Sequence, residues 1–517
     1  MTNTMERIFE PPETKAAKRH RIRTRIALGT VGVVLAASVV MGSYTWFHIC
    51  GSLGSGVWQV EGECVGVTDG SYLFDPEFET IQKKIVEENA RVRAQADSYI
   101  TVALLDLLTP TVISAKSAEN VRHGLEGAYT AQRRLNETVI PGASRPQIQL
   151  VLANKGNTDE QWRRVTAQLV AMKSIEGDGA LVAVIGLGVS TTQTQHNAEA
   201  LANDDIPMVG TLLTANELDY NHITGLIRVS PTTLDYAKAL RSHVDTRTDL
   251  TDPTDPSSAV VVYDMNSDTA DLFTKSLKND LEQEMQNLIK GRPPLPFFGA
   301  SIPSEVGAGR FDLLTPNICA PPADVVLYAG RRVDLGGLLD WLARRGCVST
   351  PLTVITAADI GELLSTREQQ LTDANLTVVS AGTNDAEGWG RGAEKAPEHY
   401  DDFLMAFREL GFDPENNAKD LVDGQAIQMH DALLTVEQAV RLAAPENSSP
   451  TAGQVRGVLL TLSGENKVQG AGGTLSFISR ATGAGNPVGK WVPVLKFPSP
   501  SADPFGRQVV TPSYVTE

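Results

Sequence analysis

The stretch VIGLGVSTTQTQHNAEALANDDIPMVGTLLTANEL, residues Val184–Leu218, says the most about the fold of this chain. An apolar run, Leu181–Ile185, is followed by small and hydroxyl residues and then by a helical stretch. A second apolar run, Ile206–Val209, also ends in a hydroxyl-rich loop. This order predicts strand, loop, helix, strand and loop. In a parallel α/β sheet both loops lie at the carboxyl ends of their strands, where open α/β sheets bind ligands.

Hydroxyl side chains are concentrated in these two loops. They belong to Ser190, Thr191, Thr192, Thr211 and Thr214. Helix N-termini with free N–H groups and adjacent hydroxyls suit a carboxylate, so the loops predict a cradle for a small polar ligand. Ser and Thr are also favoured helix N-caps, and a role in capping alone stays open at this point.

The chain repeats this alternation of strand and helix. Strands are expected at Tyr99–Leu105, Gln147–Leu152, Leu181–Ile185, Ile206–Val209, Ala259–Tyr263, Asp324–Ala329, Thr353–Ile355 and Leu376–Ser380. Amphipathic helices are expected between most of them, as at Asn120–Asn136, Asp159–Ile175 and Leu234–His243. The alternation indicates an α/β fold with parallel sheets covered by helices on both faces. Because about 400 residues exceed what one such sheet needs, we expect two lobes.

The amino-terminal segment has the pattern of a membrane anchor. Met1–Arg25 holds seven Lys or Arg against three Glu, although the whole chain has a net charge of −17. Ile26–Ile49 is apolar and long enough for the roughly 20 residues of a membrane helix. The next basic residue is Lys83. The positive-inside pattern therefore predicts a single-pass cell-membrane protein with a cytoplasmic amino terminus and an extracellular remainder.

A cleaved signal peptide is the alternative to this anchor. Its apolar core would span about 7–15 residues, and this run is longer, so the sequence favours an uncleaved signal anchor. The acidic net charge disfavours a general role in binding nucleic acid.

Four cysteines, Cys50, Cys64, Cys319 and Cys347, all follow the apolar segment. An even number in an exported region predicts disulfides, with three pairings open. Closeness in sequence favours Cys50–Cys64. Cys319–Cys347 is also reasonable, because the start of a strand and the end of the helix returning from it lie at the same end of a layer. Four unpaired thiols stay open as the alternative.

Several weak sequence matches, taken in order, resemble one family. Val209–Leu218 resembles its "I-S-P-x-x-T-x-P-E-L" segment, and Ile227–Pro231 its "F-R-x-x-P" strand. Val262–Asp264, Asp324–Gly336 and His430–Ala432 match later segments of the same pattern. The family is the type I periplasmic solute-binding proteins of the branched-chain amino acid (leucine/isoleucine/valine) type, the substrate-binding components of ABC transporters. The resemblance covers Tyr99 to Phe497.

The resemblance implies a two-lobed type I periplasmic-binding-protein fold with a hinge of several strands, here preceded by one transmembrane helix. The expected organisation is a basic cytoplasmic tail (1–25), a transmembrane anchor (26–49), a juxtamembrane linker and helix (50–97), lobe 1 (98–245), lobe 2 (246–375), a return to lobe 1 (376–478), a closing strand of lobe 2 (479–497) and a tail (498–517). The Asp-Pro-rich segment Thr246–Ser257 is expected at the first crossing between the lobes. Gly473–Phe477 and Lys490–Phe497 are expected to form a hairpin, and Pro498–Glu517 to be loosely held.

Carried over residue by residue, the resemblance implies a ligand site between the lobes. Ser190 and Thr214, with the backbone of Leu212, would bind the α-carboxylate and ammonium groups of a ligand. Asp359 is the nearest candidate for an acidic partner of the ammonium group. The complete expected set is Ser190, Thr191, Thr211, Leu212, Thr214, Asp268, Arg331 and Asp359. Arg331 and Asp268 stand where the family commonly has aromatic residues, so binding of leucine or valine does not follow.

The function expected from these patterns is capture of a small polar, amino-acid-like ligand for an ABC importer, with a permease as the membrane partner. A ligand-sensing receptor subunit and a cell-envelope interaction module stay open as alternatives. We expect no enzyme, because the sequence lacks the hydrolase, metalloprotease and phosphate-loop motifs. We also expect no cofactor and no metal.

Overall fold

The computed structural model describes residues 50–51 and most of 55–517. Within the second range the description omits 112–113, 139–144, 159, 176, 248–249, 251–257, 300–310, 393–395, 414, 416–417, 445–448, 499–507 and 510–513. The expected membrane anchor, Ile26–Ile49, lies outside the described residues. Among the described residues, no helix is long and apolar enough to cross a membrane. Residues 55–517 form one compact unit.

The first of two seven-stranded sheets forms the core of lobe 1. Its strands in spatial order are β1 (Val57–Val60), β2 (Glu63–Thr68), β4 (Gln147–Asn154), β3 (Tyr99–Asp106), β5 (Leu181–Val189), β6 (Met208–Leu212) and β7 (Leu226–Arg228). The five strands from β4 to β7 run parallel, and β2 adds antiparallel to β4. These parallel strands are buried on both faces, which explains their near-continuous apolar sequence.

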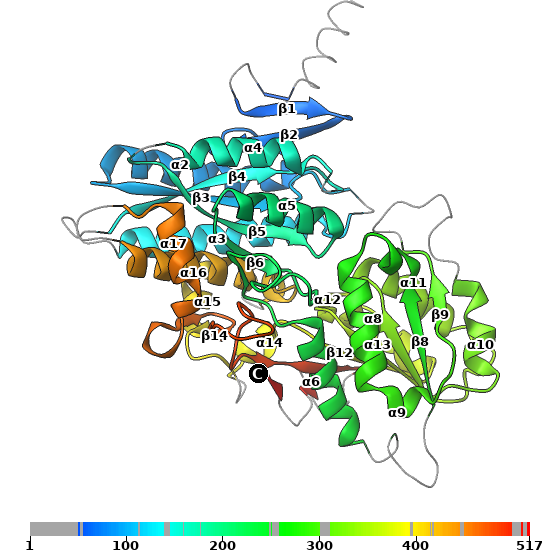
Figure 1. The fold of residues 1–517 in the computed structure, drawn as a ribbon. Coiled ribbons are helices and arrows are strands. Elements are labelled where there is room, and N and C mark those ends of the chain that lie inside the picture. The colour runs from blue at the N-terminus through cyan, green and yellow to red at the C-terminus, as the bar shows by residue number, and fades with distance from the viewer. Residues whose placement is uncertain are drawn as a thin grey trace, which may run out of the picture. The chain divides into compact units, whose positions relative to one another are not determined.

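Helices cover both faces of this sheet. The cluster on one face includes side chains of α2 (Glu79–Gln95), α3 (Ala118–Glu137), α14 (Ala386–Trp389), α15 (Tyr400–Glu409), α16 (Gln425–Ala443) and α17 (Ala452–Val458). The other face is covered by α4 (Trp162–Lys173) and α5 (Thr192–Asn203). In Figure 1 the orange α16 lies against the cyan α3. Their backbones approach closely at Gly127, where an added Cβ would meet the carbonyl oxygen of Ala426 at 2.0 Å.

The second sheet forms the core of lobe 2. Its order is β17 (Gln508–Val509), β16 (Val494–Phe497), β12 (Leu376–Ala381), β11 (Leu352–Ala357), β10 (Val325–Ala329), β8 (Ala259–Asp264) and β9 (Leu295–Phe297). The strands from β12 to β9 run parallel, whereas β16 and β17 are antiparallel. One face is covered by α10 (Thr315–Cys319), α11 (Arg332–Leu342), α12 (Gly361–Ser365) and α13 (Glu368–Asp373), and the other by α6 (Thr233–Asp245), α8 (Leu272–Glu284) and α9 (Gln286–Ile289).

The structure corrects several sequence-based expectations about which lobe a segment joins. The first crossing lies between β7 and α6, not at Thr246–Ser257, because α6 packs its apolar face on the second sheet. The strand β12 also belongs to the second sheet and not to the return to lobe 1. Turn-rich composition carries no signal of where the chain crosses between lobes, and an apolar strand carries no signal of which sheet it joins.

Both ends of the described unit are more ordered than the sequence suggested. The segment 50–97, expected to be a juxtamembrane linker and helix, contains β1 and β2, which extend the first sheet and bury Val65 and Val67. The helix expected in this segment packs on lobe 1 as α2.

The carboxyl-terminal segment also differs from expectation. Gly473–Leu475, which is β14, forms its hairpin with β13 (Val468–Gly470) and not with Lys490–Phe497. The expected tail supplies β17 and β18 (Tyr514–Val515), and β18 pairs with β15 (Trp491–Val492). The last strand of the expected pair, β16, joins the second sheet as expected.

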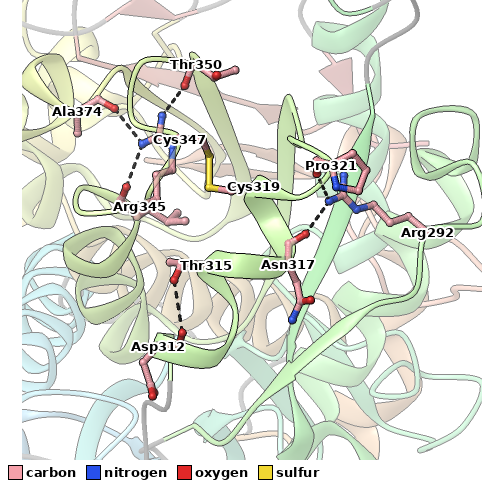
Figure 2. The surroundings of a disulfide bond; sticks show 11 residues. Arg292, Asp312, Thr315, Asn317, Cys319, Pro321, Arg345, Cys347, Thr350 and Ala374 are labelled. Atoms are coloured by element: carbon pink, nitrogen blue, oxygen red, sulfur yellow. Dashed lines mark hydrogen bonds between the residues drawn. A yellow bond between two sulfur atoms is a disulfide. The ribbon is translucent and has the colours of Figure 1, made fainter.

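A disulfide joins Cys319, at the end of α10, to Cys347, in the turn after α11 (Figure 2). The expected Cys319–Cys347 bond is therefore confirmed. Arg345 lies beside it and donates hydrogen bonds to the carbonyl oxygens of Leu342 and Ala374. No described cysteine is free, and Cys50 and Cys64 are both disulfide-bonded. The Cys319–Cys347 bond closes a loop at one end of the second sheet, far along the chain from the hydroxyl-rich loops.

Candidate functional site

The pairing of β5 with β6 is irregular near the end of β5, as at a β-bulge. The register with β6 shifts between Gly186 and Val189, and residues 186–188 all have positive φ, including the non-glycine Leu187 at 67°. The buried Lys155 donates a hydrogen bond of 2.7 Å to the carbonyl oxygen of Leu187 and helps to hold this conformation. Bulges next to sites re-aim the residues that follow them. Here the residue that follows is Ser190.

Ser190 ties the loop after β5 to the loop after β6. Its Oγ accepts hydrogen bonds from the backbone N–H of Thr214 at 2.9 Å and of Ala215 at 3.2 Å, and the side chain is buried. Thr191 caps α5 by accepting from the N–H of Thr194, and the hydroxyl of Thr211 donates to the carbonyl of Gly186 at 3.4 Å. These three hydroxyl residues therefore fix the two loops.

Arg228, at the end of β7, supports the second of these loops. Its Nη1 donates to the carbonyl oxygens of Leu213 at 2.5 Å and Ala215 at 2.8 Å, on either side of Thr214. The guanidinium is fully buried, and burial lowers the pKa of Arg228 to about 10, so it remains charged at neutral pH. The main chain that presents Thr214 is thus held from two sides.

On the second lobe, Arg331 follows β10 and joins the two lobes. It forms a bidentate ion pair with the buried Asp271, with Nε to Oδ2 at 2.5 Å and Nη2 to Oδ1 at 2.9 Å. Its Nη2 also donates to the carbonyl oxygen of Ser190 at 3.2 Å, and the backbone N–H of Phe273 donates to the same oxygen at 3.2 Å. The charge of Arg331 is therefore neutralised within the protein.

Asp359 follows β11 and has neutral hydrogen-bond donors. Its carboxylate accepts from the backbone N–H of Thr383 at 2.8 Å, from the hydroxyl of Thr383 at 2.7 Å and from the amide of Asn384 at 3.2 Å. Burial, together with the charge of Asp423, raises the pKa of Asp359 to about 7, although the hydrogen bonds from Thr383 oppose this shift. Asp359 is therefore poised to change its charge near neutral pH.

A cavity of about 130 Å³ lies between the lobes and is lined by residues of these loops. Residues of lobe 1 that line it include Lys116, Asn120, Leu212, Thr214, Asp423 and Gln425. Residues of lobe 2 that line it include Tyr236, Phe273, Arg331, Arg332, Asp359 and Thr383. A cavity of roughly 150 Å³ accommodates benzene in another protein, so the size suits a small molecule.

The structure brings four of the eight expected site residues to this cavity: Leu212, Thr214, Arg331 and Asp359. Ser190 and Thr191 follow β5 and Thr211 lies within β6, and these three residues have the bracing and capping roles given above. Asp268 ends the 3₁₀ helix Met265–Asp268, and its side chain lies outside the described part of the structure.

Three buried polar side chains line the cavity without a partner in the described part of the chain. The hydroxyls of Thr214 and Tyr236 and the side-chain amide of Gln425 make no hydrogen bond there. Buried polar groups are nearly always satisfied, so such groups facing a cavity are available to a ligand. Sequence reasoning missed Tyr236 and Gln425, because both lie in helices, α6 and α16, whereas the sequence patterns indicated the loops at strand ends.

Two ion pairs in the cavity wall were also missed. Lys116 pairs with Asp106 at the end of β3, and both side chains are buried. His123 Nδ1 lies 2.9 Å from Asp423 Oδ2; burial opposes its ionisation, but the carboxylates of Asp423 and Asp420 raise the pKa of His123 to about 10. The loop after β3 lies at the same sheet edge as the loop after β5. The rule that ligands bind at the carboxyl ends of parallel strands would therefore have indicated Lys116.

One group of side chains in the described residues has the spacing of a metal site. It consists of His123, Glu126 and Asp420. Arg122 already supplies a cation there, because its guanidinium donates to Glu126 at 2.7 Å and lies 2.9 Å from Nε2 of His123. We therefore assign no metal to this group.

Comparison with known proteins gives a likeness of fold. No protein-family model matches the chain, and no curated protein matches its sequence. An ABC transporter substrate-binding protein from Desulfitobacterium hafniense in complex with Leu superposes with a TM-score of 0.55 at 15% identity, over 80% of this chain and 100% of that one. An ABC transporter solute-binding protein from Rhodopseudomonas palustris BisB5, bound to 3,4-dihydroxybenzoic acid, gives 0.57 at 12% identity, over 81% and 98%.

A periplasmic binding protein from Burkholderia mallei gives a TM-score of 0.54 at 13% identity, over 81% of this chain and 96% of that one. The fold is therefore the two-lobed α/β fold of the type I periplasmic binding proteins, as the resemblance predicted. Each of these three structures superposes over nearly its full length and covers about four fifths of this chain.

Proposed function

We propose that this protein is a solute-binding protein that captures a small polar ligand between its two lobes. The observation that carries the proposal is the convergence of Thr214, Gln425 and Tyr236 on one cavity, since these buried groups come from both lobes and have no partner in the described residues. A ligand that supplies hydrogen bonds to all three stabilises the form in which the lobes are in contact.

Contacts beside the cavity provide the two surfaces that such a ligand would hold together. In the loop after β6, the side-chain amide of Asn216 donates to both carboxylate oxygens of Asp280 on α8, at 3.0 and 2.9 Å. The hydroxyl of Ser276, also on α8, donates to Glu217 at 2.9 Å. These contacts join the lobe that carries Thr214 to the lobe that carries Tyr236, so closure and ligand contact involve the same elements.

The same proposal includes the cellular setting. The basic segment Met1–Arg25 and the apolar segment Ile26–Ile49 would anchor the binding unit to the outer face of a membrane. The partner would be the permease of an ABC importer, which recognises the closed form. The support for this partner is the fold shared with substrate-binding proteins of ABC transporters.

The test is a thermal-shift screen of the full-length chain in detergent micelles against amino acids, amines, amides, nucleosides and aromatic acids. A ligand at 100 times its dissociation constant should stabilise the protein by about 2.7 kcal/mol. The variant Tyr236→Phe should weaken binding of any hit by about fivefold, because it removes a cavity hydroxyl that has no partner among the described residues. Tyr263→Phe, in β8 and outside the cavity lining, is the matched control. A screen without any stabilising compound, or equal binding by both variants, would overturn the proposal.

A further inference from the structure

The positive charges that line the cavity are already paired with carboxylates of the protein. Lys116 pairs with Asp106, and Arg331 pairs with Asp271 through two hydrogen bonds. Arg332 pairs with Glu362 at 2.8 Å. A ligand carboxylate would have to share these cations with buried or partly buried anions, and like charges at close range repel in a medium of low dielectric.

The backbone donors at the first-lobe rim are also occupied. The N–H groups of Thr214 and Ala215, at the start of the loop that the sequence assigned to a ligand carboxylate, both donate to Ser190 Oγ. The carbonyl of Ser190 is in turn held by Arg331 and by the N–H of Phe273. An oxyanion site needs free donors aimed at the ligand, and these donors bond within the protein.

Asp359 differs from the other charged residues of the cavity wall. Its hydrogen-bond donors, Thr383 and Asn384, are neutral, and no Lys, Arg or His nitrogen of the described residues lies within 4.0 Å of its carboxylate. The other acidic residue of the wall, Asp423, is satisfied by His123, by the amide of Asn120 at 2.6 Å and by the N–H of Gln425. Lys490 faces Asp359, but its Nζ donates to the carbonyl oxygen of Val229 at 2.9 Å, so Asp359 is the carboxylate of the wall that has no ion-pair partner among the described residues.

We propose, on the basis of the proposed function, that the ligand presents an N–H-bearing head, an amine or an amide, to Asp359 and carries no carboxylate. The hydroxyls of Thr214 and Tyr236 and the amide of Gln425 complete the polar contacts of that head. The rings of Phe273 and Tyr236 and the side chain of Leu212 provide an apolar wall for a short carbon skeleton. This ligand class differs from the leucine and aromatic acid bound by the structural neighbours, which carry carboxylates.

The experiment compares heads on matched skeletons. The full-length chain in detergent is titrated calorimetrically with 3-methylbutylamine, 3-methylbutanamide, leucine and 3-methylbutanoate, and with the same four heads on ethyl and benzyl skeletons. The amine and the amide are expected to bind at least about tenfold more tightly than the matching amino acid and carboxylate, a difference of about 1.4 kcal/mol. A preference for the carboxylate or the amino acid overturns the inference but leaves the proposed function standing. Absence of binding by every compound overturns the inference, and the thermal-shift screen described above then decides the proposed function separately.

Two variants separate the roles of the charged residues. Asp359→Asn should weaken amine binding about tenfold and change amide binding by less than about threefold, because the amide needs only an acceptor. Asp340→Asn, an exposed carboxylate of α11, is the control and should change neither. Asp271→Asn keeps a cap for α8 but removes the counter-ion of Arg331, so binding of 3-methylbutanoate should rise about tenfold. If Asp359→Asn leaves the amine unaffected while Asp271→Asn fails to improve the carboxylate, the assignment is wrong.

Discussion

The two rims of the cavity use opposite chemistry. On lobe 1, the hydroxyl and backbone groups of the loops after β5 and β6 bond mainly to one another, with Ser190 at the centre. On lobe 2, Arg331 is locked to Asp271, whereas Asp359 lacks a cationic partner among the described residues. The comparison teaches that a hydroxyl-rich loop is not by itself a binding surface. The groups that remain available, such as the hydroxyl of Thr214, are those that the internal network leaves out.

The largest effect is expected when the ion pair between Arg331 and Asp271 on lobe 2 is removed. Arg331→Ala leaves the carboxylate of Asp271 buried without its cation, and it removes the bond to Ser190 of lobe 1. The free energy of unfolding should fall by about 3–5 kcal/mol, measured by urea denaturation. Arg332→Ala breaks the neighbouring, partly exposed pair with Glu362 and should cost below about 1 kcal/mol. Equal losses of unfolding free energy in the two variants would show that the Arg331–Asp271 pair contributes no more to stability than a surface pair.

The next effect tests the bracing of lobe 1. Ser190→Ala leaves the N–H groups of Thr214 and Ala215 buried without an acceptor, and the free energy of unfolding should fall by about 2 kcal/mol. Ser174→Ala, at the exposed end of α4, removes a hydroxyl bonded to a helix carbonyl and is the control, with an expected change within about 0.5 kcal/mol. If Ser190→Ala lowers the free energy of unfolding only slightly, Ser190 does not brace the loops and is again a candidate ligand-binding residue.

A smaller effect concerns pH and Asp359. Its pKa of about 7 in the folded protein lies above that of an aspartate in the unfolded chain, so the folded protein retains a proton that the unfolded chain releases. Stability is therefore present at low pH and is lost as the pH rises through 7. The loss between pH 6 and 8 should be roughly 1 kcal/mol.

Comparison of Asp359→Asn with the parent chain isolates this contribution. The groups that face Asp359 are Asp423, Tyr236 and Lys490; burial opposes deprotonation of the tyrosine and favours it for the lysine. Urea denaturation at pH 6, 7 and 8 should show that the free energy of unfolding of the parent chain falls with pH by this amount, and that the variant lacks this part of the fall. Parallel curves for the two chains would mean that Asp359 does not titrate in this range.

The smallest effect on stability is expected at Thr214. Its hydroxyl has no partner in the described structure, so Thr214→Val should change the free energy of unfolding by less than about 0.5 kcal/mol. Affinity for a ligand should fall about fivefold, measured by calorimetry with any compound that the thermal-shift screen identifies. Thr372→Val, on α13 and away from the cavity, should leave affinity unchanged. The pair Ser190→Ala and Thr214→Val thus separates bracing from binding within one rim.

Local patterns in the sequence predicted the repeated elements well. The strand at Tyr99–Asp106 and the helix at Ala118–Glu137 follow from apolar runs and from 3.6-residue periodicity, which are properties of neighbouring residues. Assignment of β12 and α6 to a sheet failed for a physical reason. Both faces of a parallel sheet are apolar, so an apolar strand or an amphipathic helix fits either lobe.

The candidate site shows the same limit. The rule for strand ends indicated Thr214, the family resemblance indicated Arg331 and Asp359, and all three residues line one cavity. The rule does not say which hydroxyls bond within the protein. Ser190 and Thr214 have similar side chains in similar loops, and only three-dimensional distances separate the brace from the group left available to a ligand.

By itself, the sequence determined the α/β alternation and the loops from which a site is built, because these depend on short-range periodicity, and its length indicated two lobes. The tertiary structure decided which charges are paired. The partners Lys116–Asp106 and Arg331–Asp271 are brought together by folding, and the pairing of Asp423 with His123 spans 300 positions of the chain. The charge left on Asp359 is therefore a property of the folded molecule, since an electrostatic balance depends on distances that linear spacing does not fix.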